Sequence, residues 1–173
     1  MTDPESSVAL ALDATELAAP DRGRVVPLLL LAEPSASALE WSFSNLSDTV
    51  YRFDLAGTLV GAATMRWRDD PSELVELAVD EAHQGHGIGR RIVDWLVAEG
   101  RRRGRRAIEV GTSSTSLGNI AFYQKCGFRP SAVRTSGAGA EHAASATKPA
   151  DASERRRSMS GEVVDARAQR QPT

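Results

Sequence analysis

The chain has 173 residues and a formal net charge of −2, with 41% hydrophobic and 25% charged residues. This length suits one domain with a sizeable core, and the small net charge argues against a general affinity for nucleic acid. No apolar run of about 18 residues predicts a membrane span, and the first 20 residues lack the basic segment of a signal peptide. The single cysteine, Cys126, excludes an internal disulfide, so we expect a cytoplasmic protein.

The first third of the chain predicts a strand, two helices and a hairpin. A leucine-rich segment favours a helix with Pro27 in its first turn, and two runs of β-branched and aromatic residues are separated by the turn signal "DLAG". The expected elements are a strand near 8–12, helices at 24–33 and 33–46, and hairpin strands at 49–53 and 58–67.

The middle of the chain predicts a central strand, a glycine-rich loop and an amphipathic helix. Residues 73–80 are apolar on both faces, as in a strand buried on both sides. Apolar residues then recur at three and four positions over 89–104, as in a helix. A strand at 106–112 and a helix at 116–126 follow, and Gly127 provides a C-terminal cap.

The composition changes after Pro130. Residues 131–173 contain no aromatic residue and few large aliphatic ones, while Ala, Ser, Gly and Arg dominate. Such a segment buries too little apolar surface to offset the entropy of ordering it. We therefore expect a weakly patterned segment at 1–21, a folded domain at 22–130 and a disordered low-complexity tail at 131–173.

The sequence "QGHGIGRR" at 84–91 places three glycines between the central strand and the next helix. A helix N-terminus has unpaired amides and a partial positive charge, and glycines let a phosphate approach those amides. The Walker loop is excluded because no lysine is present, and the dinucleotide-binding fingerprint because its third glycine falls one position later. A tight turn without a ligand is the alternative interpretation.

The segment Gln84–Gly89 resembles the Q/R-x-x-G-x-G/A loop of the GNAT superfamily of acetyl-CoA-dependent N-acetyltransferases. "AFYQKCGF" at 121–128 is similar to the second hallmark of that family, and the resemblance covers roughly 24–129. It implies an α+β fold of three layers, with a mixed, mainly antiparallel central sheet and helices on both faces. It also implies transfer of an acetyl group from acetyl-CoA to a primary amine of a small molecule or peptide.

The resemblance implies two groups of coenzyme contacts and a third, altered one. The loop amides bind the pyrophosphate, the end of the central strand pairs with the pantetheine arm, and the usual asparagine is replaced by Ser116, with Asn119 one turn later. The residues implied are Leu77, Ala78, Val79, Gln84, Gly85, His86, Gly87, Ile88, Gly89, Arg90, Ser116 and Asn119.

Acetyl transfer to a protonated amine benefits from a base, and the departing thiolate benefits from an acid. By resemblance Tyr123 is the acid, with simple packing of its ring as the alternative. Glu73 and Glu76 are weak candidates for the base, and a solvated carboxylate at a strand edge is the favoured interpretation of each. His83 and His86 lack further ligands nearby, so we expect no metal.

Family members normally end with two more strands, but the sequence of residues 131–173 shows no strand pattern. We therefore expect these C-terminal strands to be missing or disordered, as in a truncated or frameshifted family member, and the strand at 106–112 to have an exposed edge that favours a homodimer. A non-catalytic acyl-CoA-binding module is the alternative function. The arginines at 101–106 allow a third reading, nucleic-acid binding, but a solvated helix end explains them better. The expected partners are acetyl-CoA and an amine, without nucleic acid or membrane.

Overall fold

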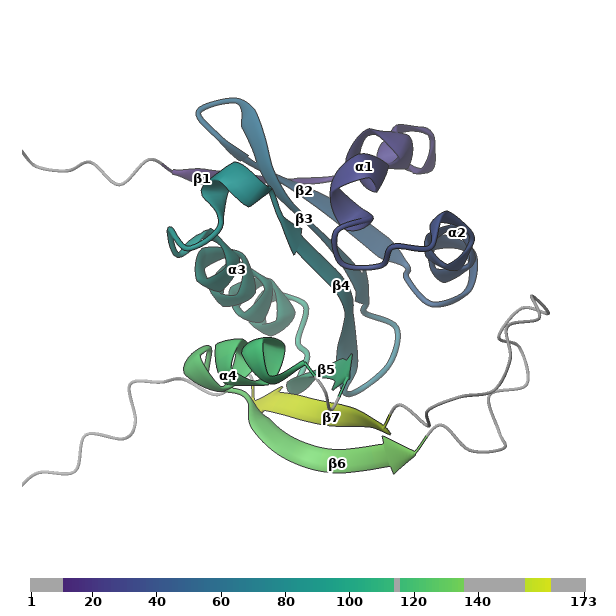
Figure 1. The fold of residues 1–173 in the computed structure, drawn as a ribbon, viewed down its shortest axis with the longest axis vertical. Coiled ribbons are helices and arrows are strands. Elements are labelled where there is room, and N and C mark those ends of the chain that lie inside the picture. The colour runs from purple at the N-terminus through teal and green to yellow at the C-terminus, as the bar shows by residue number, and fades with distance from the viewer. Residues whose placement is uncertain (1–10, 114–115, 136–154, 163–173) are drawn as a thin grey trace, which may run out of the picture. The chain divides into compact units, whose positions relative to one another are not determined.

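The computed structural model describes residues 11–113, 116–135 and 155–162 (Figure 1). The chain divides into two compact units, one formed by the residues up to Met65 together with Glu76–Trp95, and the other by Arg66–Val75 together with the residues from Leu96 onward. No helix among the described residues is both long and apolar enough to cross a membrane.

The described elements begin with a strand and three helical segments, which a run of three strands follows. In chain order they are β1 (Leu12–Glu16), the 3-10 helix η1 (Ala19–Val25), α1 (Val26–Leu29), α2 (Ala36–Asn45), β2 (Thr49–Leu55), β3 (Thr58–Arg66), β4 (Ser72–Val79), the 3-10 helix η2 (Glu81–His83), α3 (Ile88–Arg102), β5 (Ala107–Ser113), α4 (Leu117–Lys125), β6 (Arg129–Thr135) and β7 (Arg155–Glu162).

The hairpin and the second helix confirm the sequence predictions. β2 and β3 pair antiparallel, and the turn between them places Ala56 and Gly57 at positive φ of 49° and 80°, as two-residue hairpins require. The Ser35 hydroxyl caps α2 by accepting from the Ala38 amide at 3.2 Å. β1 begins at Leu12, where the predicted strand ends, and the predicted helix at 24–33 is divided between η1 and the short α1.

Helices cover both faces of the sheet in the first unit, as the resemblance implies. On one face, Val50 and Ala62 pack into a buried cluster with Leu29 of α1 and Leu39 of α2. The neighbouring residues Tyr51 and Phe53 point to the other face, because side chains alternate along a strand. There both rings meet Trp95 of α3 edge-on, with centroids 5.1 and 5.4 Å away.

Close approach of α3 to the sheet depends on Gly61 of β3. A Cβ at this position would lie 2.4 Å from the Ile92 Cδ1 atom and 3.3 Å from the Ala78 carbonyl oxygen. The helix that follows the glycine loop therefore packs directly on the strands that precede the loop, which fixes where its N-terminus lies in the first unit.

In the second unit, β5 pairs parallel with β4 and antiparallel with β7, and β7 pairs antiparallel with β6. The expectation that the C-terminal strands are missing thus differs from the structure, which has both β6 and β7. The physical reason is that backbone groups make a ladder, so a strand that pairs on both sides, as β7 does, needs no aromatic side chains. Pro130, which cannot donate to a ladder, lies at the register shift of β6.

The predicted exposed edge on β5 is also corrected. β7 pairs with β5 over seven residue pairs, from Ala107 to Ser113. The predicted homodimer was based on this exposed edge. It therefore stays a prediction that the pairing of β5 does not support. The disorder predicted for the rest of the tail falls on 136–154 and 163–173, which lie outside the described residues.

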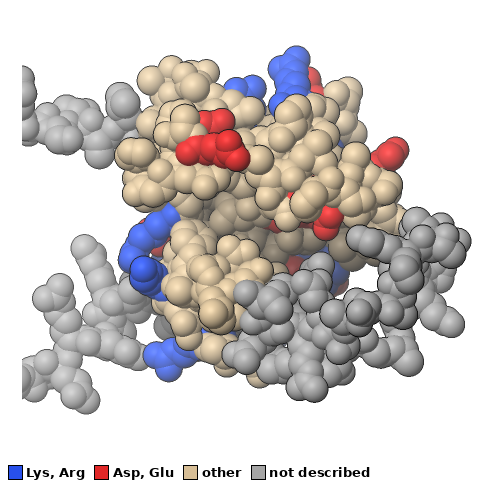
Figure 2. Space-filling model, in the orientation of Figure 1, with Lys and Arg blue, Asp and Glu red and all other residues tan. Residues whose placement is uncertain are grey.

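Acidic and basic side chains both lie on the face shown in Figure 2, with uncharged residues between them. Several arginines of the cluster at 101–106 have acidic partners. Arg106 binds Asp70 at 2.8 Å with its own side chain 86% exposed, and such exposed pairs contribute little to stability. This pairing supports the interpretation of the cluster as a solvated helix end.

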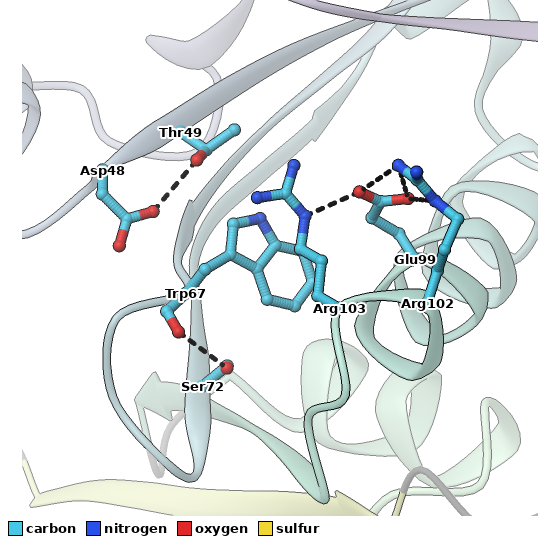
Figure 3. A network of polar contacts seen from close by, with 7 residues as sticks. All are labelled: Asp48, Thr49, Trp67, Ser72, Glu99, Arg102 and Arg103. Atoms are coloured by element: carbon cyan, nitrogen blue, oxygen red, sulfur yellow. Dashed lines mark hydrogen bonds and ion pairs between the residues drawn. The ribbon is translucent and has the colours of Figure 1, made fainter.

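Unlike Arg106, Glu99 of α3 forms its ion pairs with a buried side chain, which is only 4% exposed. Its carboxylate accepts from Arg102 at 2.8 Å and from Arg103 at 2.6 Å, and the Arg103 guanidinium lies over the Trp67 ring, 5.3 Å from its centroid (Figure 3). Burial alone would raise the pKa of Glu99, but the hydrogen bonds from Arg103 and Arg102 hold it below its ordinary value of 4.5. The sequence analysis did not single out Glu99 for this role.

We expect Glu99→Gln to destabilise the fold by about 2–3 kcal/mol, because it removes charge-assisted hydrogen bonds to a buried acceptor. A group with a lowered folded pKa stabilises above its unfolded pKa and loses that contribution as the pH falls through the folded value. The difference between wild type and variant should therefore shrink below about pH 4. Urea unfolding at several pH values measures it.

Asp94→Asn is the matched control on the same helix, because Asp94 pairs with Arg90 at 3.7 Å and both side chains are more than half exposed. It should cost less than about 1 kcal/mol. Equal losses for the two variants would contradict the assignment of Glu99 as a structural anchor.

Candidate functional site

The loop between β4 and α3 has the backbone conformation that its glycines predict. Gly85 and Gly87 have φ of 76° and 79°, values that residues with a Cβ rarely adopt. A Cβ at either position would meet no other atom within 4 Å. The glycines therefore serve the backbone conformation, and the space in front of the loop is open.

Side chains of the loop bind back to the chain and fix its course. The Gln84 side chain donates to the Val79 carbonyl at 2.9 Å, and the His86 ring nitrogen Nδ1 lies 2.8 Å from the Gln84 carbonyl oxygen. Asp80 caps η2 by accepting from the Ala82 amide at 3.1 Å, and it contacts the His83 ring at 2.9 Å. The sequence analysis missed Asp80, although an aspartate at the start of a helical turn is a known capping signal.

The loop ends in the N-terminus of α3, a helix of 15 residues. The Arg91 amide donates to the Gly87 carbonyl at 3.1 Å, so the helical ladder begins there. The amides before it have no acceptor within an α-helix, and they carry its positive partial charge. All residues from Gln84 to Gly87 are exposed, whereas Ile88 is buried. These features together make a surface that can receive an anion.

The strand before the loop contributes Leu77, Ala78 and Val79. Ala78 is buried against the α1 and α2 face, whereas Leu77 and Val79 are half-buried. Among the described residues, the ladder between β4 and β5 comprises three pairs and ends at Leu74. It ends before the three residues for which the resemblance implies contacts with pantetheine.

The two candidate bases lie in different surroundings. Glu73 forms an ion pair with Arg66, whose guanidinium also binds Asp69 at 2.7 Å. Glu76 accepts instead from the hydroxyl of Ser42 in α2 at 2.5 Å, and its amide donates to the Thr64 hydroxyl at 3.0 Å. Arg66 therefore occupies the Glu73 carboxylate, whereas the Glu76 carboxylate contacts a neutral hydroxyl.

Tyr123 lies in α4 of the second unit and is 8% exposed. Its ring packs against Phe122 and Phe128, with centroids 5.0 and 5.6 Å away. Burial, with a smaller contribution from Cys126, raises the pKa of Tyr123 above its ordinary value. The phenol therefore keeps its proton at neutral pH, which leaves both the packing role and a role as proton donor open.

The remaining predicted residues occupy the ends of helices. Ser116 is the N-cap residue of α4 and accepts from the Ile120 amide through its carbonyl, while Asn119 lies exposed in the first turn. Gly127 has the positive φ of 93° that the predicted C-terminal cap of α4 requires. No group of three potential metal ligands occurs among the residues described.

The predicted site residues are divided between the two units. The first unit contains Glu76, Leu77–Val79 and Gln84–Arg90 along one continuous strand–loop–helix segment, and the second contains Glu73, Ser116, Asn119 and Tyr123. Ser42 and Ser47 of the first unit belong to no pattern that the sequence analysis singled out.

Comparison with known sequences identifies a family. The sequence model described as "Acetyltransferase (GNAT) family" matches residues 16–128. An uncharacterized N-acetyltransferase of Bacillus subtilis, YvbK, is 33% identical over 120 residues, which cover 68% of this chain and 76% of the relative. The ribosomal protein bS18-alanine N-acetyltransferase of Escherichia coli K12 is 27% identical over 115 residues, 63% of this chain and 78% of the enzyme.

Solved structures share the fold. The IAA acetyltransferase of Bacillus cereus has a TM-score of 0.68 at 23% identity and covers 88% of this chain and 99% of its own. A GNAT family acetyltransferase of Elizabethkingia anophelis, solved with acetyl-CoA bound, has a TM-score of 0.69 at 21% identity and covers 87% and 97%.

Proposed function

The chain belongs to the GNAT family of acetyltransferases, and from this premise we propose that it transfers the acetyl group of acetyl-CoA to a primary amine. The observation that carries the proposal is the segment from β4 to α3, in which Gly85 and Gly87 at positive φ lead into the N-terminus of a long helix. Acetyl-CoA is bound in the similar structure from Elizabethkingia anophelis, which supports the choice of cosubstrate.

We propose that the loop holds the coenzyme pyrophosphate. The amides from Gly85 to Arg90 lie at the N-terminus of α3, where the helix dipole also favours a negative charge. Each hydrogen bond to a charged group contributes about 1.5–3 kcal/mol, so two or three of them supply much of the affinity. The Arg90 side chain, 61% exposed beside Asp94, adds positive charge near the same place.

We propose that the pantetheine arm pairs with the backbone of Leu77–Val79. Support comes from the short β4–β5 ladder, which ends at Leu74 and so does not extend to these residues. A strand whose pairing stops leaves amides and carbonyls along one edge, and an amide-containing chain such as pantetheine satisfies them as an added strand would. Ser116 and Asn119 are proposed as further polar contacts.

For the chemical step we propose Glu76 as the base and Tyr123 as the acid. The neutral amine attacks the thioester carbon, the carbon–sulfur bond breaks, and the coenzyme leaves as a thiolate. Glu76 accepts the proton that the amine loses, directly or through water, and the Tyr123 phenol protonates the thiolate. Glu73 is less suited because Arg66 holds its carboxylate.

The test is acetyl-CoA-dependent release of free thiol with a panel of amines that includes polyamines, amino acids, aryl amines and peptides with free N-termini. Transfer is confirmed when the acetylated amine is found by mass spectrometry. Calorimetry with acetyl-CoA runs in parallel. Coenzyme binding without transfer to any amine would favour a non-catalytic acyl-CoA-binding module, and absence of binding would contradict the proposal.

A further inference from the structure

Two buried serines lie beside the proposed base. Ser42 in α2 is only 4% exposed, and Ser47 is only 6% exposed. The Ser42 hydroxyl donates to the Glu76 carboxylate at 2.5 Å, and the two serine hydroxyls lie 3.4 Å apart. This chain of oxygens connects a helix to a strand 34 residues away, entirely within the first unit.

Serine is an unusual choice for the buried face of a helix that packs on a sheet. It favours helices less than leucine or alanine does, and its hydroxyl must find a partner when buried. Ser44 on the same helix behaves as exposed serines commonly do, since its hydroxyl donates to the Glu40 carbonyl one turn earlier at 3.0 Å. The Ser42 hydroxyl instead donates across to β4, which indicates a role for that contact.

Backbone hydrogen bonds also fix the positions of Glu76 and Ser47. The Glu76 amide donates to the Thr64 hydroxyl of β3 at 3.0 Å. The Ser47 amide donates to the Ser42 carbonyl at 2.9 Å, which turns the end of α2 and brings Ser47 beside Ser42. The backbones of Glu76 and Ser47 are therefore each fixed by a separate bond, and the Glu76 carboxylate contacts the Ser42 hydroxyl.

We propose that Ser42 is a positioning residue for acetyl transfer: it holds the Glu76 carboxylate in one orientation and in its ionised form, with Ser47 supporting the Ser42 hydroxyl. This inference rests on the proposed function, because it presupposes Glu76 as the base. A hydroxyl that donates to a carboxylate stabilises the charged form, and the short distance is typical of such charge-assisted bonds. A fixed carboxylate also loses no orientational freedom when the amine arrives.

The test compares wild type with Ser42→Ala, Ser42→Thr and the matched control Ser44→Ala. Without the donor, the Glu76 carboxylate should take up a proton more readily, so the acid limb of the pH profile of kcat/KM should move by about one pH unit to higher pH in Ser42→Ala. The kcat should fall roughly tenfold while the KM for acetyl-CoA stays unchanged. Ser42→Thr, which keeps the hydroxyl, should restore most of both, and Ser44→Ala should behave as wild type.

A second measurement does not depend on turnover. Carbon-13 NMR of glutamate-labelled protein follows the Glu76 carboxyl carbon through a pH titration, with Glu76→Gln used to assign the signal. Its midpoint should move in Ser42→Ala by about the same amount as the acid limb. Thermal unfolding of each variant shows whether the fold persists over the range titrated.

Each outcome bears on a different statement. An NMR midpoint that does not move in Ser42→Ala would overturn the inference, since the hydroxyl would then not act on the carboxylate. A midpoint that moves without the acid limb would also overturn it, while leaving acetyl transfer established with another base. Absence of transfer by wild type would refute the proposed function itself. Parallel shifts, restored by threonine, are the result we expect.

Discussion

Replacing Gly87 with valine is expected to weaken acetyl-CoA binding by at least about a hundredfold while the protein remains folded. Gly87 has a φ of 79°, a conformation that costs a residue with a Cβ about 1–2 kcal/mol and a β-branched residue more. Because the surrounding space is open, the variant relieves this strain by turning the peptide rather than by displacing neighbours. Turning it misdirects the amides at the start of α3.

The expected size follows from the bonds lost. Each hydrogen bond to a phosphate oxygen contributes about 1.5–3 kcal/mol, and about 1.4 kcal/mol corresponds to a tenfold change in affinity. Loss of two such bonds, about 3 kcal/mol or more, therefore weakens binding by at least about a hundredfold. Isothermal titration calorimetry with acetyl-CoA and with coenzyme A measures both ligands, which share the pyrophosphate and should be affected alike.

Gly104→Val is the matched control, because Gly104 has a φ of 71° and equally open surroundings, but follows the other end of α3. Both variants carry a similar backbone strain and should lower the free energy of unfolding by similar amounts. Only Gly87→Val should lose coenzyme affinity. Equal affinities in the two variants would show that the loop conformation has no part in binding.

The elements that the sequence predicted well are those specified by local signals. The hairpin of β2 and β3 follows from a turn whose residues accept positive φ, and α4 ends where Gly127 provides its cap. The amphipathic helix α3 follows from the spacing of its apolar residues, of which Ile92 and Leu96 are buried. In each case a few neighbouring residues decide the conformation, so tertiary packing does not overrule them.

The features that the sequence did not predict depend on partners distant in the chain. β7 is stabilised by ladders to β5 and β6. Its own residues are mostly polar or charged and do not predict a strand. The contact of Ser42 with Glu76 joins residues 34 positions apart, and no periodicity marks it. The strand β4 was expected to be buried on both faces, but Glu73 and Glu76 lie half-buried. The run of apolar residues around them predicts burial and does not show which positions of the strand contact polar groups.

The second large effect is expected at Tyr123. Replacing it with phenylalanine should lower kcat by about two orders of magnitude, which lies at the lower end of the range for general acid catalysis, and should leave the KM for acetyl-CoA little changed. The variant removes only the hydroxyl, while the ring keeps its contacts with Phe122 and Phe128. Steady-state kinetics with the amine identified by the screen separates kcat from KM.

Phe122→Leu is the control for packing, since it disturbs the Tyr123 ring without removing the phenol. It should reduce the free energy of unfolding more than Tyr123→Phe does, yet reduce kcat less. The opposite ranking of the two kcat values would assign Tyr123 to the core alone, and an unchanged kcat in Tyr123→Phe would exclude it as the acid.

The pH profile gives an independent check on the same hydroxyl. Burial, followed by the influence of Cys126, raises the pKa of Tyr123 above its ordinary value of 10.0. A group with a raised pKa keeps its proton as the pH rises through its ordinary value, so the phenol can still donate above about pH 10. The kcat of wild type should therefore not decline near pH 10 through loss of this proton. A decline centred there that is absent from Tyr123→Phe would show an ordinary, solvated phenol and contradict its placement in the buried cluster beside Phe128.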